Sequence, residues 1–173
     1  SLFVISDLKP EQIEGARLNH IQVKPWRGFV CRNLWIYFVL PRIHASVAKT
    51  INDNFDKVFV NHDYFTKSPY LLRYLRKKSI YLCQEPQREF YEPSKIHASS
   101  LKEKIANMLR FPIKVIDEIN VKKADTVICN SRFSQHVISK IYGRRCEIVY
   151  PGVDEGFFKP CNNKEEMILC VGG

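Results

Sequence analysis

The chain of 173 residues lacks both a long hydrophobic run and the short motifs of several large enzyme classes. Its longest apolar stretch is LWIYFVL at 34–40, whereas a helix that spans a membrane needs about 20 such residues. It contains no Gly-x-Gly-x-x-Gly, no lysine-containing phosphate loop and no Gly-x-Ser-x-Gly. None of its five histidines pairs with another at the spacing of metal ligands. These absences argue against a membrane-spanning segment, a P-loop enzyme and a zinc site.

The six cysteines show no Cys-x-x-Cys spacing. Cys83, Cys129 and Cys170 lie inside apolar runs, where a thiol packs as a small hydrophobic group. This distribution favours reduced thiols over a disulfide framework. We therefore expect a cytoplasmic protein.

Basic residues exceed acidic ones, and the formal net charge is +9. A charge of this size is typical of proteins that bind nucleic acid, an anionic membrane surface or phosphate-bearing substrates, and it also occurs on surfaces without a partner. The remaining composition, 45% hydrophobic and 26% charged, is that of a globular protein, and no repeat or low-complexity tract interrupts it. Charge alone leaves the partner open.

Strand-sized apolar runs alternate with segments of helical periodicity. The runs are LFVIS at 2–6, KVFVNH at 57–62, SIYLC at 79–83, DTVICN at 125–130, EIVYP at 147–151 and MILCV at 167–171. The helical segments are 31–51 with a bend or restart at Pro41, 68–76, 101–119 with a kink at Pro112, and 131–142 with Gly143 as its stop. This alternation predicts an α/β fold, a doubly wound and mostly parallel sheet with helices on both faces. His44 and His136 fall on the helices, and we expect them at the surface or at the edge of the core.

Polar residues follow two of the predicted strands, at the end where parallel α/β sheets bind ligands. After KVFVNH, His62 and Asp63 can bind a hydroxylated ligand or transfer a proton, or the loop can simply form turns and cap a helix. After SIYLC, Gln84, Glu85 and Arg88 stand beside two aromatic residues. That mixture can hold a sugar or a phosphate, or it can cover the end of the sheet.

The segment NSRFSQHVISKIYG at 130–143 begins where another predicted strand ends. Ser131 is the expected N-cap, and the free N–H groups of the first turn, with Arg132 in it, attract phosphate or sugar oxygens. Pro151 and Gly152 end the next strand, and the glycine permits a backbone conformation or a close approach that other residues resist. The following GVDEGFFKP leads to MILCV, as in a crossover to a second domain.

The stretch KKADTVICNSRFSQHVISKIYGRRCEIVYPGVDEGFFKP at 122–160 closely resembles the end of the N-terminal domain of family 4 (group 1) glycosyltransferases. Its strand, Asn-Ser, helix, Tyr-Gly, strand, Pro-Gly-Val-Asp and Phe-x-Pro occur in the family's order. SIYLCQEPQREFYEP and KVFVNHDYFTKSPYLL also resemble the family, so the resemblance covers roughly residues 56–173. Gln84 stands where the family often carries histidine.

The resemblance implies a retaining enzyme with two Rossmann-like domains, the GT-B fold. Residues 1–160 would be the acceptor-side domain, with its first strand and Gly-rich loop preceding Ser1, and 161–173 the crossover and first strand of a donor-binding domain. The enzyme would move a hexose such as mannose from a nucleotide-diphosphate sugar to a lipid-linked or polysaccharide acceptor, without a metal or another cofactor. We expect it in the cytoplasm, with peripheral contact to the anionic face of the membrane.

The resemblance also assigns roles to residues. Those expected on the acceptor side or lining the cleft are His62, Asp63, Gln84, Glu85, Arg88, Ser131 and Arg132, and those expected at the interdomain crossover are Pro151, Gly152, Val153 and Asp154. We expect no nucleic-acid partner. The alternatives are a non-catalytic basic α/β module that binds RNA or an anionic membrane, and a related phosphosugar enzyme of the same two-domain plan.

Overall fold

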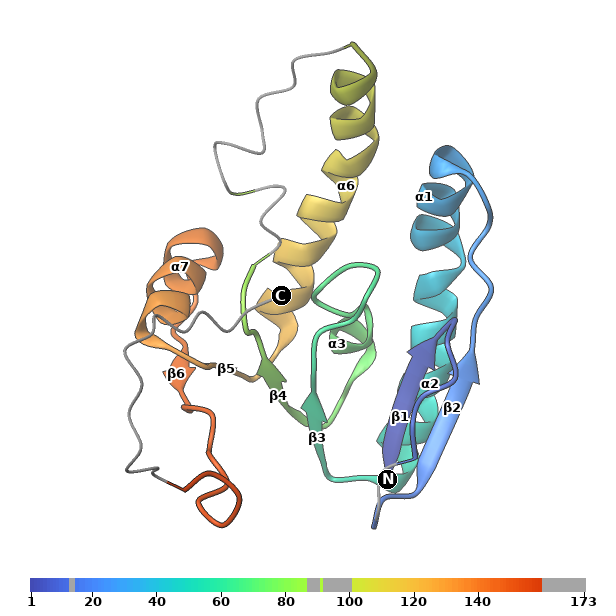
Figure 1. Ribbon diagram of the computed structural model, residues 1–173. Helices are drawn as coiled ribbons and strands as arrows, with labels where there is room; N and C mark the ends of the chain where they lie inside the picture. The colour runs from blue at the N-terminus through green and yellow to red at the C-terminus, as the bar shows by residue number, and fades with distance from the viewer. Residues whose placement is uncertain (13–14, 87–90, 92–100, 160–173) are drawn as a thin grey trace.

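The computed structural model describes residues 1–12, 15–86, 91 and 101–159, in which strands and helices alternate (Figure 1). The strands are β1 (Leu2–Ser6), β2 (Leu18–Gln22), β3 (Lys57–Val60), β4 (Lys78–Leu82), β5 (Thr126–Cys129) and β6 (Glu147–Ile148). The helices are α1 (Phe29–Phe38), α2 (Leu40–Asn54), α3 (Leu71–Tyr74), α6 (Leu101–Lys123) and α7 (Arg132–Tyr142).

All strand pairs of the described residues are parallel, and they form two sheets. One sheet pairs β1 with β2, and the other has the order β3-β4-β5-β6. The predicted parallel α/β class is therefore confirmed, and five of the six predicted strand runs overlap an observed strand. The sixth run, 167–171, lies outside the described residues. Strand β2 was not predicted, because Asn19 and His20 interrupt its apolar pattern.

The helix boundaries follow from local sequence. Helix α1 ends at Phe38 and α2 begins at Leu40, so the predicted restart at Pro41 is confirmed, with proline in the first turn, where its missing N–H costs no helical bond. Helix α7 has both predicted caps: the Ser131 side chain accepts from the Ser134 amide, and Gly143 closes the helix with φ 62°.

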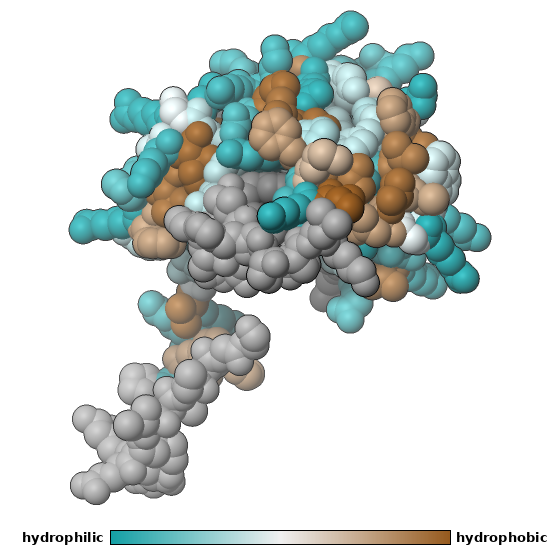
Figure 2. All heavy atoms as spheres, turned by 90° about the horizontal axis from the view of Figure 1, so that it is seen from above, coloured by the Kyte–Doolittle hydropathy of each residue, from teal (hydrophilic) through white to brown (hydrophobic). Residues whose placement is uncertain are grey.

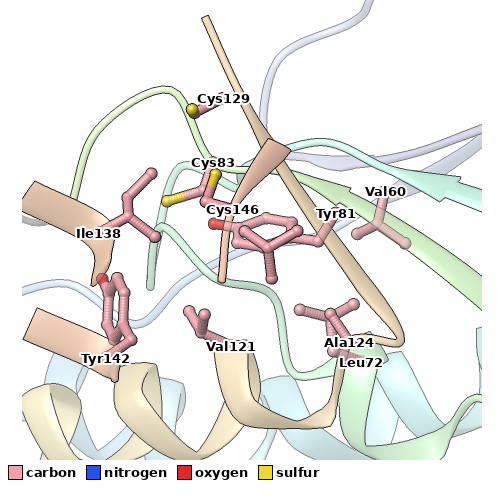
Figure 3. Packing of buried hydrophobic residues seen from close by; sticks show 11 residues of the cluster. Val60, Leu72, Tyr81, Cys83, Val121, Ala124, Cys129, Ile138, Tyr142 and Cys146 are labelled. Carbon is pink, nitrogen blue, oxygen red and sulfur yellow. The ribbon is translucent and has the colours of Figure 1, made fainter. Parts of the chain in front are cut away.

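One face of the four-stranded sheet is buried against helices. Val60, Tyr81 and Val127 point from three neighbouring strands into a core that α3, α6 and α7 complete. Figure 3 shows this core at close range, with the three buried cysteines among its members. The expectation that thiols pack as hydrophobic groups is confirmed for Cys83 and Cys129, which are buried and free.

The opposite face of this sheet is exposed. Phe59 of β3 and Ile80 of β4 are register partners on that face, and their exposed fractions are 62% and 39%. Strand residues alternate between faces, so the buried core and this pair lie on opposite sides. Helices on both faces of the four-stranded sheet were expected, and in the described part of the chain the helices cover one face.

A second core lies beside the two-stranded sheet. Trp35 of α1, Leu40 of α2, and Phe65 and Tyr70 of the loop after β3 are buried together with Ile113 of α6. The rings of Trp35 and Phe65 meet edge to face with centroids 5.1 Å apart. Helix α6 therefore contributes to both cores, through Ile113 here and through Val121 in the first.

Candidate functional site

The loop after β3 is held by its own aspartate. Asp63 Oδ1 accepts hydrogen bonds from the backbone N–H groups of Phe65 (2.7 Å) and Thr66 (2.6 Å), and Oδ2 accepts from the Thr66 hydroxyl (2.8 Å). The carboxylate thus organises the turn, which is the structural role anticipated for this loop. His62 is exposed, and its Nδ1 lies 3.1 Å from Asn61 Oδ1.

Lys67 connects this loop to the loop after β4. Its backbone adopts φ 60°, a left-handed conformation that is uncommon outside glycine. Its carbonyl accepts from the Tyr81 hydroxyl at 3.3 Å, and its Nζ lies 3.7 Å from Glu85 Oε1. Side chains from the loops that follow β3 and β4 therefore meet at the carboxyl edge of the sheet.

Ser134 joins the start of α7 to the same loop. Its buried hydroxyl donates to the Gln84 carbonyl at 2.7 Å and lies 3.0 Å from Asn130 Oδ1. Its amide donates to Ser131 Oγ at 3.1 Å. The residue was not singled out from the sequence, although its place at the third helical position after Ser131 is where an N-cap finds its donor.

These contacts bring together four of the predicted site residues. Gln84 and Glu85 are exposed after β4, Ser131 is half-buried as the cap of α7, and Arg132 is exposed in its first turn. The surface they form, which we call the β4–α7 edge, carries carboxylate, amide and guanidinium groups beside a helix N-terminus. Arg88 and Phe90 lie outside the described residues.

Tyr91 is half-buried and packs against the core. Its hydroxyl lies 3.3 Å from Asp117 Oδ2, and its ring packs edge to face on Tyr142 with centroids 5.9 Å apart. The sequence left two roles open for the aromatic residues of this loop, contact with a sugar or cover for the end of the sheet. The contacts of Tyr91 with α6 and α7 favour the second role for this residue.

Asp117 is the buried acceptor at the centre of these contacts. It is only 1% exposed, and it accepts from the hydroxyls of Ser68 and Tyr142, the latter at 2.6 Å. Burial raises the pKa of its carboxyl to about 6, and the hydrogen bonds from Ser68 and Tyr142 oppose that rise. The network fixes the loop before α3 and the end of α7 to α6.

His44 is buried, with 2% of its surface exposed, so the expectation of a surface or core-edge position was wrong. It shares the inward stripe of α2 with Leu40, Val47 and Ile51, a spacing that could have revealed its burial. Its Nδ1 accepts from the Leu71 amide at 3.0 Å, which leaves the proton on Nε2. Burial lowers the pKa of the ring, so the neutral form is favoured.

A pocket of about 600 Å³ lies between β1, β3 and α2, and two more of the predicted site residues, His62 and Asp63, line it. Its walls are Ser1–Ile5 and Lys57–Val60, and it is also lined by His44 and Ile51 of α2 and by Phe55, which directly follows α2. His62 and Asp63 line the pocket where β3 ends. The described residues predicted for the acceptor side and the cleft thus fall into two groups, one at this pocket and one at the β4–α7 edge.

The predicted crossover residues Pro151, Gly152, Val153 and Asp154 are exposed after β6. Asp154 Oδ1 accepts from the amides of Gly156 (2.9 Å) and Phe157 (3.2 Å), so it caps a turn. Gly152 has neither a positive φ nor an atom within 4 Å of a Cβ placed on it. The described residues therefore give no reason for a glycine at this position, and the close approach of its backbone to a ligand stays a prediction.

Within the described ranges, no group of three or more His, Cys, Asp or Glu side chains is arranged to hold a metal ion. None of the helices described is both long and apolar enough to cross a membrane.

Comparisons of the chain with protein-family models, with curated proteins and with solved structures found no significant match.

Proposed function

We propose that the chain is the acceptor-side part of a retaining glycosyltransferase, which moves a hexose such as mannose from a nucleotide-diphosphate sugar to a lipid-linked or polysaccharide acceptor. The observation that best supports the proposal is the hydrogen bond of 2.7 Å from the Ser134 hydroxyl to the Gln84 carbonyl. It joins two of the segments that resemble the family, at the sheet edge where α/β folds bind ligands.

The β4–α7 edge offers the chemistry that such a reaction needs. Glu85 and Gln84 can accept and donate hydrogen bonds to sugar hydroxyls. Arg132 and the N-terminus of α7 can stabilise the negative charge that develops on a departing diphosphate. The resemblance adds Arg88 to this set as a further cation.

The donor would be held mainly by a second domain that follows the crossover at Pro151–Asp154. On this view residues 1–173 alone bind nucleotide-sugars weakly and neither transfer nor hydrolyse their sugar. Metal is not required, because arginine and helix dipoles can supply the charge stabilisation. The donor is then a substrate rather than a cofactor.

The surface of α1 and α6 fits an enzyme that works at the cytoplasmic face of an anionic membrane. Figure 2 shows the molecule from above, with brown hydrophobic patches between teal side chains. Met108 and Phe111 of α6 are 69% and 60% exposed, and Lys104 and Lys114 lie on the same helix. Such a mixture suits peripheral contact with lipid headgroups and a lipid-linked acceptor.

The experiment is sugar transfer by the intact protein from a panel of nucleotide-hexoses. Arg132→Ala should lower transfer about 10- to 100-fold, the loss expected when one charge-assisted hydrogen bond is removed. Arg145→Ala is the matched control, because Arg145 is an exposed arginine beyond the other end of α7, and it should leave transfer unchanged.

Two results would contradict the proposal. One is the absence of transfer with every donor, and the other is an equal loss in both arginine variants. If the protein instead binds RNA with a steep salt dependence and no response to sugars, the alternative of a basic binding module is favoured.

A further inference from the structure

Lys67 has an unfavourable backbone conformation at the carboxyl edge of the four-stranded sheet. Its φ is 60°, and among the described residues it is the one non-glycine residue with a positive φ. A residue with a Cβ is disfavoured in this conformation, whereas glycine adopts it without a steric cost. Residues in such conformations persist where the surrounding structure holds them, and they gather at functional sites.

The neighbours of Lys67 fix its backbone on both sides. Thr66 and Ser68 are fully buried, each with 0% of its surface exposed. The Thr66 hydroxyl donates to Asp63 Oδ2, and the Asp63 amide donates to the Lys67 carbonyl at 2.8 Å. The Ser68 carbonyl accepts from the Asn120 side chain of α6 at 2.7 Å. The backbone of Lys67 is therefore held by the turn after β3 and by α6, while its side chain reaches solvent.

The side chain of Lys67 contributes little to stability in return for this strain. Within the described part of the chain its ammonium forms one ion pair, with Glu85 Oε1 at 3.7 Å, and the exposed fractions of the two side chains are 37% and 53%. An exposed ion pair of this kind contributes little to folding. Glycine would form the same turn without the strain, so stability does not account for the lysine.

The spacing of the ion pair leaves both groups able to bind a ligand. At 3.7 Å the nitrogen and the oxygen are farther apart than in a hydrogen bond, which spans about 2.7 to 3.2 Å. The ammonium therefore keeps its three donors, and the carboxylate keeps its acceptor sites. A sugar hydroxyl can accept from Lys67 while it, or the hydroxyl beside it, donates to Glu85. A phosphate bound to Lys67 would lie beside the negative charge of Glu85, which disfavours it.

We propose that Lys67 and Glu85 form a binding site for the hydroxyl groups of a sugar, and that the strained backbone of Lys67 is retained because it directs the ammonium to this site. Under the proposed function, on which this assignment rests, the sugar is the terminal residue of the acceptor, because Arg132 and the start of α7 suit the donor's diphosphate. The acceptor then already carries a sugar, and an earlier sugar transfer must supply it. Lys67 was not expected at the site from the sequence.

Lys67→Gly tests the backbone strain. Glycine removes the steric cost at φ 60°, so the melting temperature of the intact protein should rise by about 2 to 4 °C. Lys24→Gly is the matched control, because Lys24 is an exposed loop lysine whose φ is not positive. Glycine at position 24 should leave the melting temperature equal or lower, since it adds freedom to the unfolded chain.

Titrations with methyl hexosides, followed by saturation-transfer NMR, test the sugar site without any transfer reaction. The intact protein should bind at least one of the methyl glucoside, galactoside and mannoside, and Lys67→Met and Glu85→Gln should each weaken that binding about 10-fold. Lys140→Met, at an exposed position in the last turn of α7, should leave it unchanged. Inorganic phosphate at the same concentration should not displace the glycoside, because Glu85 disfavours an anion beside Lys67.

Transfer kinetics distinguish the sugar of the acceptor from the hexose of the donor. In the intact protein, Lys67→Met should raise the KM for a glycan acceptor about 10-fold and leave the KM for the nucleotide-hexose unchanged.

Five results would overturn the proposal: no rise in melting temperature with Lys67→Gly, binding of no methyl hexoside, hexoside binding that Lys67→Met leaves unchanged, displacement of the hexoside by phosphate, or a raised KM for the donor alone. If no nucleotide-hexose supports transfer but hexoside binding depends on Lys67, the proposed function fails and the sugar site stands. If transfer occurs and Lys67→Met changes neither binding nor KM, the sugar site fails and the proposed function stands.

Discussion

At the scale of single residues, buried polar side chains determine how the strand-end loops are held. Ser134 and Asp117 each bind partners from separate elements, and both were missed from the sequence. Ser131 was found, because an N-cap is a local feature with a compositional signal. The partners of Asp117 lie 25 or more residues away in sequence, and no local pattern reports such contacts.

Asp117→Asn should change how stability depends on pH. Burial raises the pKa of Asp117 from 3.8 to about 6, so between these values the folded chain binds more protons than the unfolded chain. Its contribution to the free energy of unfolding is fully present below about pH 4 and is lost as pH rises through about 6, by up to roughly 3 kcal/mol.

The measurement is urea unfolding of both proteins from pH 4 to pH 7. The stability of the wild type relative to Asp117→Asn should fall across this interval, since asparagine does not titrate. If the free energies of unfolding of the two proteins change with pH in parallel, Asp117 does not titrate in this interval.

At the scale of elements, helix α7 and the strands of the four-stranded sheet were predicted well, whereas the pairing of strands was not. Helix α7 combines an apolar stripe with two caps, and all three signals are local. The division into two sheets depends on β1 and β3, which are separated by 50 residues and do not pair. Helix α3 is shorter than the predicted 68–76, because Leu75 is already extended.

Ser134→Ala tests the junction between α7 and β4. Removal of the hydroxyl leaves the Gln84 carbonyl and Asn130 Oδ1 without this donor, and we expect a loss of about 1 to 3 kcal/mol in the free energy of unfolding. Ser139→Ala on the exposed side of the same helix should be nearly neutral. Chemical denaturation measures the free energy of unfolding of both variants. If Ser134→Ala is as stable as Ser139→Ala, other contacts hold the junction.

At the scale of the whole molecule, α6 links two cores and still leaves an apolar stripe exposed. Ile105, Met108, Phe111, Val115 and Ile119 recur at helical spacing on its outer side. Arg110 lies over the ring of Phe29, so the exposed residues of α1 lie near those of α6. A partly exposed apolar stripe of this length favours contact with a partner or a membrane.

Vesicle flotation of the intact protein tests the membrane interpretation. Anionic vesicles at low salt should recover more protein than neutral ones, because each basic residue near the headgroups contributes about 1 kcal/mol. Met108→Asp should reduce that recovery, whereas Phe157→Asp, at a 78% exposed position in the loop after β6, should not. Equal recovery with neutral and anionic vesicles would exclude electrostatic membrane binding.

The buried cysteines allow unfolding of the chain to be followed by alkylation of their thiols. Cys31 is exposed, while Cys83, Cys129 and Cys146 share the core beneath α7 (Figure 3). Burial also raises the pKa of Cys83 to about 12, so little reactive thiolate forms there. An alkylating reagent would modify Cys31 at once and reach these three thiols only when the core opens. The mass added over time to the peptides that contain Cys83, Cys129 and Cys146 would then report the lifetime of the folded core, without any introduced probe.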